Sequence, residues 1–190
     1  MISIEACHPN MNGNSGGSGN SGDTETTTGT SIVWEKSLRT NGEERLTKVF
    51  KMTTKTYAAG EALCKKYGGI ISSVETSNEL DVLGTNLNTK YALLGAKVKK
   101  NCQCPTRNTN GKCTKTANCS LKTAFDWTDT SIKTREIFDS LPNADYADIL
   151  LVERVITKEG AHTAEIVSYQ ESDIAGFDLG VYCAKSDQKG

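Results

Sequence analysis

The sequence predicts an α+β fold, with one globular domain behind a polar N-terminal tail. Two helical segments, starting near residues 56 and 76, lie between an early hairpin and several late strands. Helices that are grouped apart from runs of strands are typical of the α+β class. A chain of 190 residues is long enough for one such domain and a tail.

The beginning of the chain differs in composition from the rest. Residues 9–30 are almost wholly Asn, Gly, Ser, Thr and acidic residues. Such a segment has too few apolar side chains to offset the entropy lost on ordering, so we expect a flexible tail or linker over 1–30. The globular domain is then expected over 31–186, followed by a short tail over 187–190.

An early hairpin is predicted ahead of the first helix. Strand-like runs at 31–34 and 46–52 flank the segment Thr40-Asn-Gly-Glu43. Asn-Gly between two such runs favours a tight turn, because both residues tolerate a positive φ.

Each helix has a local start signal, and the first also has a stop signal. The first helix is expected from near Thr56 to Gly68-Gly69, because glycine favours the end of a helix. The second is expected from the capping box Thr76-Ser-Asn-Glu79 through Leu87. The expected buried side of the first helix comprises Tyr57, Ala58, Ala62 and residues 64–67.

The remaining apolar runs are predicted to be strands. Tyr91-Ala-Leu-Leu-Gly95 is typical of a central buried strand, and a short apolar strand is expected directly after the first helix. The late strands are expected at 148–156, 163–169 and 180–183. The stretch 129–147 has no clear periodicity and contains a proline, so we expect a long irregular loop there.

The seven cysteines indicate either an oxidising compartment or metal binding. Cys102, Cys104, Cys113 and Cys119 are not spaced as the C-x₂₋₄-C pairs of a structural zinc site. We therefore expect two disulfides, either nested as Cys102–Cys119 and Cys104–Cys113 or crossed as Cys102–Cys113 and Cys104–Cys119. A metal-binding intracellular protein that uses this cluster is the alternative, and titration of free thiols separates the two.

Cys64 in the first helix, Leu93-Leu-Gly95, Phe125-Asp-Trp-Thr-Asp129 and Cys183 in the last strand follow one another in a distinctive order. Taken in that order, these segments resemble the C-type lectin-like domain, and the cysteine-bearing insertion resembles that of secreted nematode members of the family. The resemblance implies two helices with antiparallel sheets, an N-terminal hairpin and a long irregular loop. It also implies a Cys64–Cys183 disulfide and a core position for Trp127.

The calcium-binding motifs of that family are missing here. The loop motif, typically Glu-Pro-Asn, is replaced by Leu141-Pro-Asn143, and leucine cannot bind a cation. Where the family's downstream Trp-Asn-Asp is expected, the chain has Thr163-Ala-Glu165. We therefore expect no metal or cofactor, calcium included, and no calcium-dependent change in stability.

The resemblance implies an extracellular recognition module that engages a protein or glycan ligand through the long loop, with innate immunity as a candidate setting. The alternative within the family is calcium-dependent carbohydrate binding. The candidate ligand-binding residues are those with polar or aromatic side chains in or near the loop: Phe138, Asn143, Asp145, Tyr146, Asp148, Glu153 and Glu165.

Other functions find little support in the sequence. The two histidines, His8 and His162, belong to no catalytic motif, so we expect no enzyme activity. A net charge of -1 argues against nucleic-acid binding, and no apolar run is long enough to span a bilayer. We expect a secreted chain that is either a trimmed mature form or begins with an added Met. Cys7 makes the cysteine count odd, which leaves a free thiol or an intermolecular disulfide as alternatives.

Overall fold

The computed structural model describes residues 32–103, 119, 123–134, 136–138 and 148–187. The described residues from Val33 onward belong to one unit. Their strands are β1 (Glu35–Leu38), β2 (Glu44–Lys51), β3 (Ile70–Ile71), β4 (Tyr91–Val98), β5 (Phe125–Trp127), β6 (Ile149–Ile156), β7 (His162–Tyr169) and β8 (Leu179–Ser186). Their helices are α1 (Tyr57–Lys66), α2 (Ser77–Asn86) and the short 3₁₀ helices η1 (Lys100–Cys102), η2 (Glu136–Phe138) and η3 (Glu171–Gly176).

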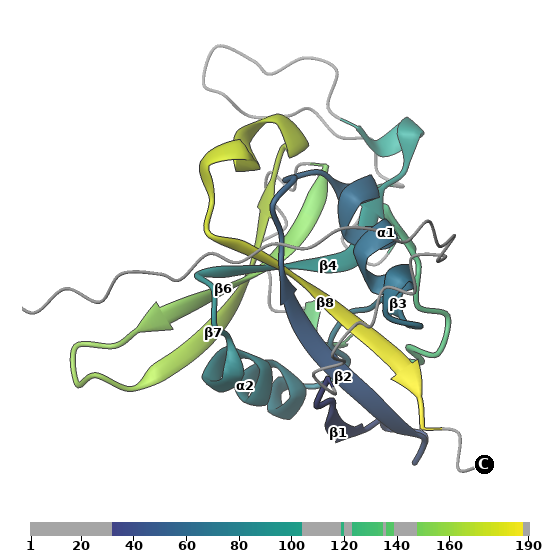
Figure 1. Ribbon diagram of the computed structural model, residues 1–190. Coiled ribbons are helices and arrows are strands. Elements are labelled where there is room, and N and C mark those ends of the chain that lie inside the picture. The colour runs from purple at the N-terminus through teal and green to yellow at the C-terminus, as the bar shows by residue number, and fades with distance from the viewer. Residues whose placement is uncertain (1–31, 104–118, 120–122, 135, 139–147, 188–190) are drawn as a thin grey trace, which may run out of the picture. The chain divides into compact units, whose positions relative to one another are not determined.

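The described strands form one sheet in the order β1-β2-β8-β4-β6-β7 (Figure 1), with β3 paired to β8 and β5 paired to β4. The predicted α+β class is therefore confirmed. The resemblance implied antiparallel sheets, but β4 and β8 pair in parallel. This pairing arises because the last strand inserts between β2 and β4 and runs antiparallel to β2.

The two α-helices pack on opposite faces of the sheet, and β4 lies between them. Leu93 of β4 belongs to a buried cluster with Cys64 of α1, whereas Leu94 belongs to a second buried cluster with Leu83 of α2. Successive residues of a strand point to opposite faces, so a strand covered on both sides must be apolar throughout. The continuous apolar run 91–95, which was predicted to be a central buried strand, is part of β4 and is covered on both faces.

The structure confirms where both helices begin. The Thr56 hydroxyl caps α1 by accepting a hydrogen bond from the Ala59 N–H, at 3.2 Å. The Thr76 hydroxyl caps α2 in the same way, accepting from the Glu79 N–H at 3.1 Å. Gly68, with φ of +73°, follows the end of α1, where an L-residue would be strained.

The expected buried side of α1 was only partly right. Its buried residues are Tyr57, Gly60 and Cys64, which recur at helical spacing. Ala58 and Ala62 are exposed, as are Lys65 and Lys66, because they lie on the opposite side of the helix.

The predicted hairpin exists, but its first strand was placed too early in the chain. The turn is closed by hydrogen bonds from the Arg39 N–H to the Glu43 carbonyl and from the Gly42 N–H to the Arg39 carbonyl. The first strand is the polar segment β1 rather than residues 31–34. β1 is an edge strand and largely exposed, so its sequence does not show the apolar pattern on which the prediction relied.

Among the helices that the structure describes, none is long and apolar enough to cross a membrane.

Candidate binding face at the base of the long loop

Two disulfides fix the framework of the candidate site. Cys64–Cys183 joins α1 to β8, which is the pairing that the resemblance implied. Cys102–Cys119 closes a segment with a sequence separation of 17. This bond fits the nested arrangement and is incompatible with the crossed one, in which Cys102 pairs with Cys113. Cys104 and Cys113 lie outside the described residues, as does Cys7.

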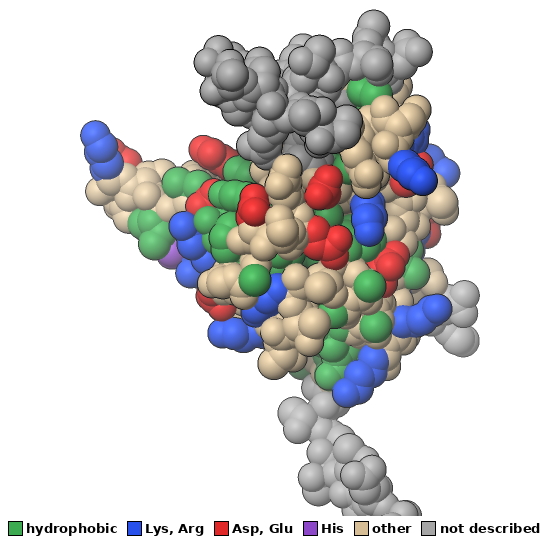
Figure 2. Space-filling view, turned by 90° about the horizontal axis from the view of Figure 1, so that it is seen from above, with side chains coloured by type: hydrophobic (Ala, Val, Ile, Leu, Met, Phe, Trp, Pro, Cys, Tyr) green, Lys and Arg blue, Asp and Glu red, His purple; other side chains and the backbone are tan. Residues whose placement is uncertain are grey.

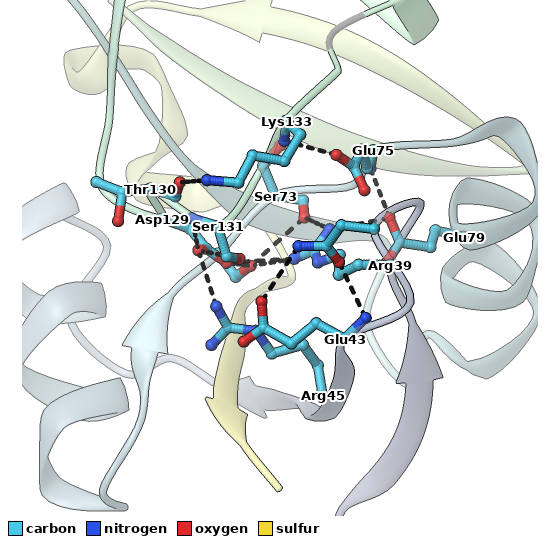
Figure 3. A network of polar contacts seen from close by, with 12 residues as sticks. Arg39, Glu43, Arg45, Ser73, Glu75, Glu79, Asp129, Thr130, Ser131 and Lys133 are labelled. Carbon is cyan, nitrogen blue, oxygen red and sulfur yellow. Dashed lines mark hydrogen bonds and ion pairs between the residues drawn. The ribbon is translucent and has the colours of Figure 1, made fainter.

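Asp129 is the centre of a buried polar network (Figure 3). It follows β5 and is fully buried. Its Oδ1 accepts hydrogen bonds from the backbone N–H and the hydroxyl of Ser131, at 2.9 and 2.6 Å, and its Oδ2 accepts from the Ser72 hydroxyl. Burial alone would raise the pKa of Asp129, but these hydrogen bonds and the charge of Arg39 outweigh it and lower the pKa below its ordinary value.

Arg39 connects this carboxylate to the rest of the network. Its guanidinium is fully buried and lies 3.2 Å from Asp129 Oδ2 and 3.0 Å from Glu79 Oε2. The same guanidinium donates to the Ser73 carbonyl at 3.0 Å. One side chain in the hairpin turn therefore joins the segment after β5 to the first turn of α2.

Glu75 holds the next part of that segment. Its Oε1 accepts hydrogen bonds from the N–H groups of Lys133 and Thr134, at 2.6 and 2.9 Å, and its Oε2 accepts from the Thr40 N–H at 3.0 Å. Burial raises the pKa of this carboxyl, but the backbone hydrogen bonds have the larger combined effect and lower it. Residues 129–134 are therefore fixed to the core directly ahead of η2.

Both described ends of the long loop are also fixed to the core. Phe138 is 1% exposed and packs on Trp127, with ring centroids 4.8 Å apart. At the other end, the Asp148 carbonyl accepts a hydrogen bond from the Val98 N–H at 2.8 Å. The loop therefore leaves and rejoins the domain beside the end of β4.

A shallow depression lies at this place, which we call the loop-base depression. It has a volume of about 290 Å³. Its lining combines two aliphatic residues, Ala58 and Val98, with aromatic, cationic, acidic and hydroxyl-bearing ones: Tyr57, Glu61, Lys97, Asp126, Trp127 and Thr128.

Within the loop-base depression, Tyr57 contacts both Thr128 and Lys97. The hydroxyls of Tyr57 and Thr128 are 2.9 Å apart, and Lys97 Nζ lies 5.4 Å from the centre of the Tyr57 ring. Lys97 Nζ is also 3.8 Å from Glu171 Oε2 in η3. Burial raises the pKa of Tyr57 to about 12, so this phenol stays protonated and can donate a hydrogen bond at neutral pH.

Charged side chains are dense on the neighbouring surface. Both η3 and α1 lie toward the upper part of Figure 1, and the view from above shows acidic side chains near the middle of that face with lysines and arginines beside them (Figure 2). A surface on which charges of both signs are interspersed suits a polar ligand better than a large apolar ligand.

The structure does not bring together those predicted ligand-binding residues that it describes. Asp148 lies at the base of the loop and is half-buried. Glu153 and Glu165 are directly opposite each other on β6 and β7. They lie roughly 16 Å along the strand from Asp148, at about 3.3 Å per residue. Glu153 is also engaged internally, because it accepts a hydrogen bond from the Tyr91 hydroxyl at 3.1 Å.

Two further expectations about the site are corrected. Phe138 is buried in the core and so anchors the loop rather than presenting its ring to a ligand. Residues 163–165 do not occupy the place expected for the downstream calcium motif, because they lie at the hairpin end of β7, where Thr163 pairs with Val155. The end of β7 near the loop is Tyr169, opposite Ile149. Asn143, Asp145 and Tyr146 lie outside the described residues.

Sequence reasoning did not identify Tyr57 and Glu171 as members of this site. The Tyr57 N–H, at the start of α1, donates to Glu171 Oε1 at 2.6 Å across a sequence separation of 114. No local pattern indicates a contact between residues so far apart. Lys97 is one of three lysines within residues 97–100, and such a run in the sequence indicates only a solvated strand end.

No three His, Cys, Asp or Glu side chains among the described residues form a group that could hold a metal ion. Comparison of the chain with models of protein families and with curated protein sequences finds no match.

Proposed function

We propose that this chain is an extracellular recognition module of the C-type lectin-like type, which binds a protein or glycan ligand without calcium. The observation that carries the proposal is the disulfide between the first helix and the last strand, together with a long loop that begins after Trp127-Thr-Asp129. Two disulfides within a small domain also favour an oxidising, extracellular setting.

The loop-base depression is the proposed centre of the binding face. It combines an aromatic ring, a cation and hydroxyl donors within one shallow surface, and it lies where both ends of the long loop are fixed. Aromatic and hydrogen-bonding groups placed together on a rigid support are suited to recognising polar partners. The buried network around Asp129 supplies that support.

The absence of calcium follows from the sequence of the loop motif. Leu141, in the place of the first oxygen ligand of the loop motif, offers no side-chain oxygen. A tight calcium site needs about six to eight oxygen ligands. The four-cysteine metal site is not favoured either, because Cys102 and Cys119 are bonded to each other and cannot supply thiolates.

The first test is to probe glycan and extracellular-protein arrays with the full, oxidised chain in excess calcium and in excess EDTA. The proposal predicts selective binding of the same targets in both conditions. Binding that appears only with calcium would support the calcium-dependent alternative, and the lack of any selective target on either array would contradict a recognition function.

A further inference from the structure

The turn of the β1–β2 hairpin contains an asparagine followed by a glycine, and both residues are exposed. Gly42 has a φ of +80°, and a Cβ atom added to it would meet nothing within 4 Å. The backbone nitrogen of a glycine is the least hindered nucleophile in a chain, because glycine has no side chain. The carboxamide of Asn41 is therefore open to attack by the Gly42 nitrogen, which is the first step of deamidation.

The side chain of Asn41 is held against the chain that follows it. Its Oδ1 accepts a hydrogen bond from the Glu43 N–H at 2.9 Å, as in an Asx turn. This bond spans the Gly42 peptide group, so it keeps the carboxamide next to the Gly42 nitrogen. The Glu43 N–H also polarises the carboxamide, because it stabilises the negative charge that Oδ1 gains during attack on Cγ.

Glu43 also places a carboxylate beside the leaving group. Its Oε2 lies 3.4 Å from Asn41 Nδ2, and its Oε1 is held in an ion pair with Arg45 Nε at 3.2 Å. A carboxylate in this position can take the proton of the attacking nitrogen and pass it to the departing amine, which is general acid–base catalysis. Glu43 thus contacts both polar atoms of the carboxamide.

One hydrogen bond opposes the reaction. The Gly42 N–H donates to the Arg39 carbonyl at 2.9 Å, and it must leave this acceptor before the nitrogen can attack. The turn begins at an edge strand, β1, that is largely exposed, and segments of this kind open locally at a small cost in free energy. The bond therefore slows the reaction and makes its rate depend on opening of the turn.

From these observations we propose that Asn41 is a modification site, which deamidates spontaneously in the folded chain. The Gly42 nitrogen loses its proton and forms a bond to Asn41 Cγ, and the bond from Cγ to Nδ2 breaks to release ammonia. Water then opens the resulting succinimide. If the bond from the nitrogen to Cγ breaks, the product is aspartate. If the bond from the nitrogen to the original backbone carbonyl carbon breaks, the product is isoaspartate, whose main chain is longer by one methylene group.

The isoaspartate product changes the turn that holds the buried network (Figure 3). The Arg39 guanidinium binds Asp129, and the Thr40 N–H donates to Glu75 Oε2 at 3.0 Å. The turn is closed by the hydrogen bond from the Arg39 N–H to the Glu43 carbonyl, and a longer main chain between them disturbs this bond. Isoaspartate should therefore weaken the support of the segment after β5, whereas aspartate leaves the main chain unchanged. This effect does not depend on the proposed recognition function.

The test is to incubate the folded, full chain at neutral and mildly alkaline pH and to follow its tryptic peptides by chromatography and mass spectrometry. Peptide 40–45 contains Asn41 as its single asparagine. Peptide 108–112 contains another Asn-Gly pair, outside the described residues, and is the reference in the same sample. We expect peptide 40–45 to convert to aspartate and isoaspartate forms, faster at the higher pH, because the deprotonated nitrogen is the nucleophile. Peptide 40–45 that stays unchanged while peptide 108–112 converts would overturn the proposal.

Two variants test the part that the turn plays. Glu43→Gln keeps the backbone N–H but removes the carboxylate, and we expect it to slow conversion of peptide 40–45 at least about fivefold. Glu44→Gln is the matched control, because Glu44 is the next, exposed glutamate and pairs with Lys36 instead, at 3.7 Å. It should leave the rate unchanged. Equal rates in Glu43→Gln and Glu44→Gln would contradict the assigned role of Glu43.

The effect on the network is measured on the modified protein itself. Isoaspartate-containing chains, separated after incubation, should melt at a lower temperature than the wild type. Asn41→Asp carries the same added charge on an unchanged main chain and should melt close to the wild type. If the isoaspartate form melts with Asn41→Asp, the turn does not transmit the modification to the network, and this part of the proposal is wrong.

Discussion

At the scale of single residues, the domain depends on charges that are buried and paired. Asp129, Arg39 and Glu79 are each almost wholly buried, and each lies on a different segment of the chain. Removing one partner of such a group leaves an uncompensated charge in the interior, which is far more damaging than losing a surface ion pair. The network therefore makes the position of the segment after β5 depend on the hairpin and on α2.

We predict that Asp129→Asn lowers the free energy of unfolding by about 3–5 kcal/mol at neutral pH, because Arg39 loses a buried partner. The pKa of Asp129 is lowered by folding, so its stabilising effect is present above about pH 4 and is lost as the pH falls through the folded-state value. The difference between wild type and variant should therefore narrow in acid. Urea denaturation of both proteins from pH 7 to pH 3 measures this difference in the free energy of unfolding.

Glu79 also contributes to the pH dependence of both proteins. Its pKa is raised, so its contribution changes with pH in the opposite direction to that of Asp129. A difference between wild type and Asp129→Asn that is constant over the whole pH range would contradict the assigned role of Asp129.

At the scale of elements, α2 packs against β7 at a point where the helix has no side chain. A Cβ atom on Gly84 would lie 2.4 Å from the Cβ of Ala164 in β7. Alanine is the better helix former by about 1 kcal/mol, whereas an overlap in a packed interior typically costs about 1–3 kcal/mol. Close packing therefore outweighs helix propensity at this position.

We predict that Gly84→Ala destabilises the domain by up to about 2 kcal/mol, which is the cost of the overlap less the gain in helix propensity, because α2 must move away from β7. Thr85→Ala, at the next and exposed position of α2, is the matched control and should be neutral or slightly stabilising. Adding Ala164→Gly to Gly84→Ala should recover part of the loss. A Gly84→Ala variant that melts at or above the wild-type temperature would show that α2 does not pack on β7 in this way.

How far the sequence predicts these elements depends on how local their signals are. Thr56, Thr76 and Gly68 act on their own helices, and all three boundaries were predicted correctly. β1 was misplaced because an exposed edge strand needs no apolar pattern. The buried polar network around Asp129 was not predicted, because Arg39 and Asp129 are 90 residues apart. Asp129 was named only as the last residue of the segment 125–129, which resembles the C-type lectin-like domain.

At the scale of the whole molecule, the two disulfides restrain the unfolded chain to different degrees. Cys64–Cys183 spans a sequence separation of 119, and Cys102–Cys119 one of 17. In the chain-entropy model, the stabilisation grows with the logarithm of the loop length. The bond between α1 and β8 should therefore contribute more to stability than the bond beside β4.

We predict that replacing Cys64 and Cys183 together by alanine lowers the free energy of unfolding by about 5 kcal/mol, and that the same change at Cys102 and Cys119 lowers it by about 3 kcal/mol. Guanidinium denaturation of the two variants and the wild type measures both values. A larger loss from the Cys102–Cys119 pair would show that local packing, rather than the restraint on the unfolded chain, determines what these bonds contribute.

The central claim is calcium-independent recognition at the loop-base depression. The most direct measurement is an equilibrium titration of an array-selected ligand with the wild type in calcium and in EDTA, and with Lys97→Ala and Lys51→Ala. Lys51 is the matched control, since it is also an exposed lysine in an ion pair, with Asp178 at 3.1 Å, but it lies on β2, opposite Gly180 of β8, and does not line the depression. We predict equal affinity in calcium and EDTA, a loss of at least about fivefold for Lys97→Ala, and no change for Lys51→Ala. Loss of binding in EDTA, or full affinity in Lys97→Ala, would contradict the claim.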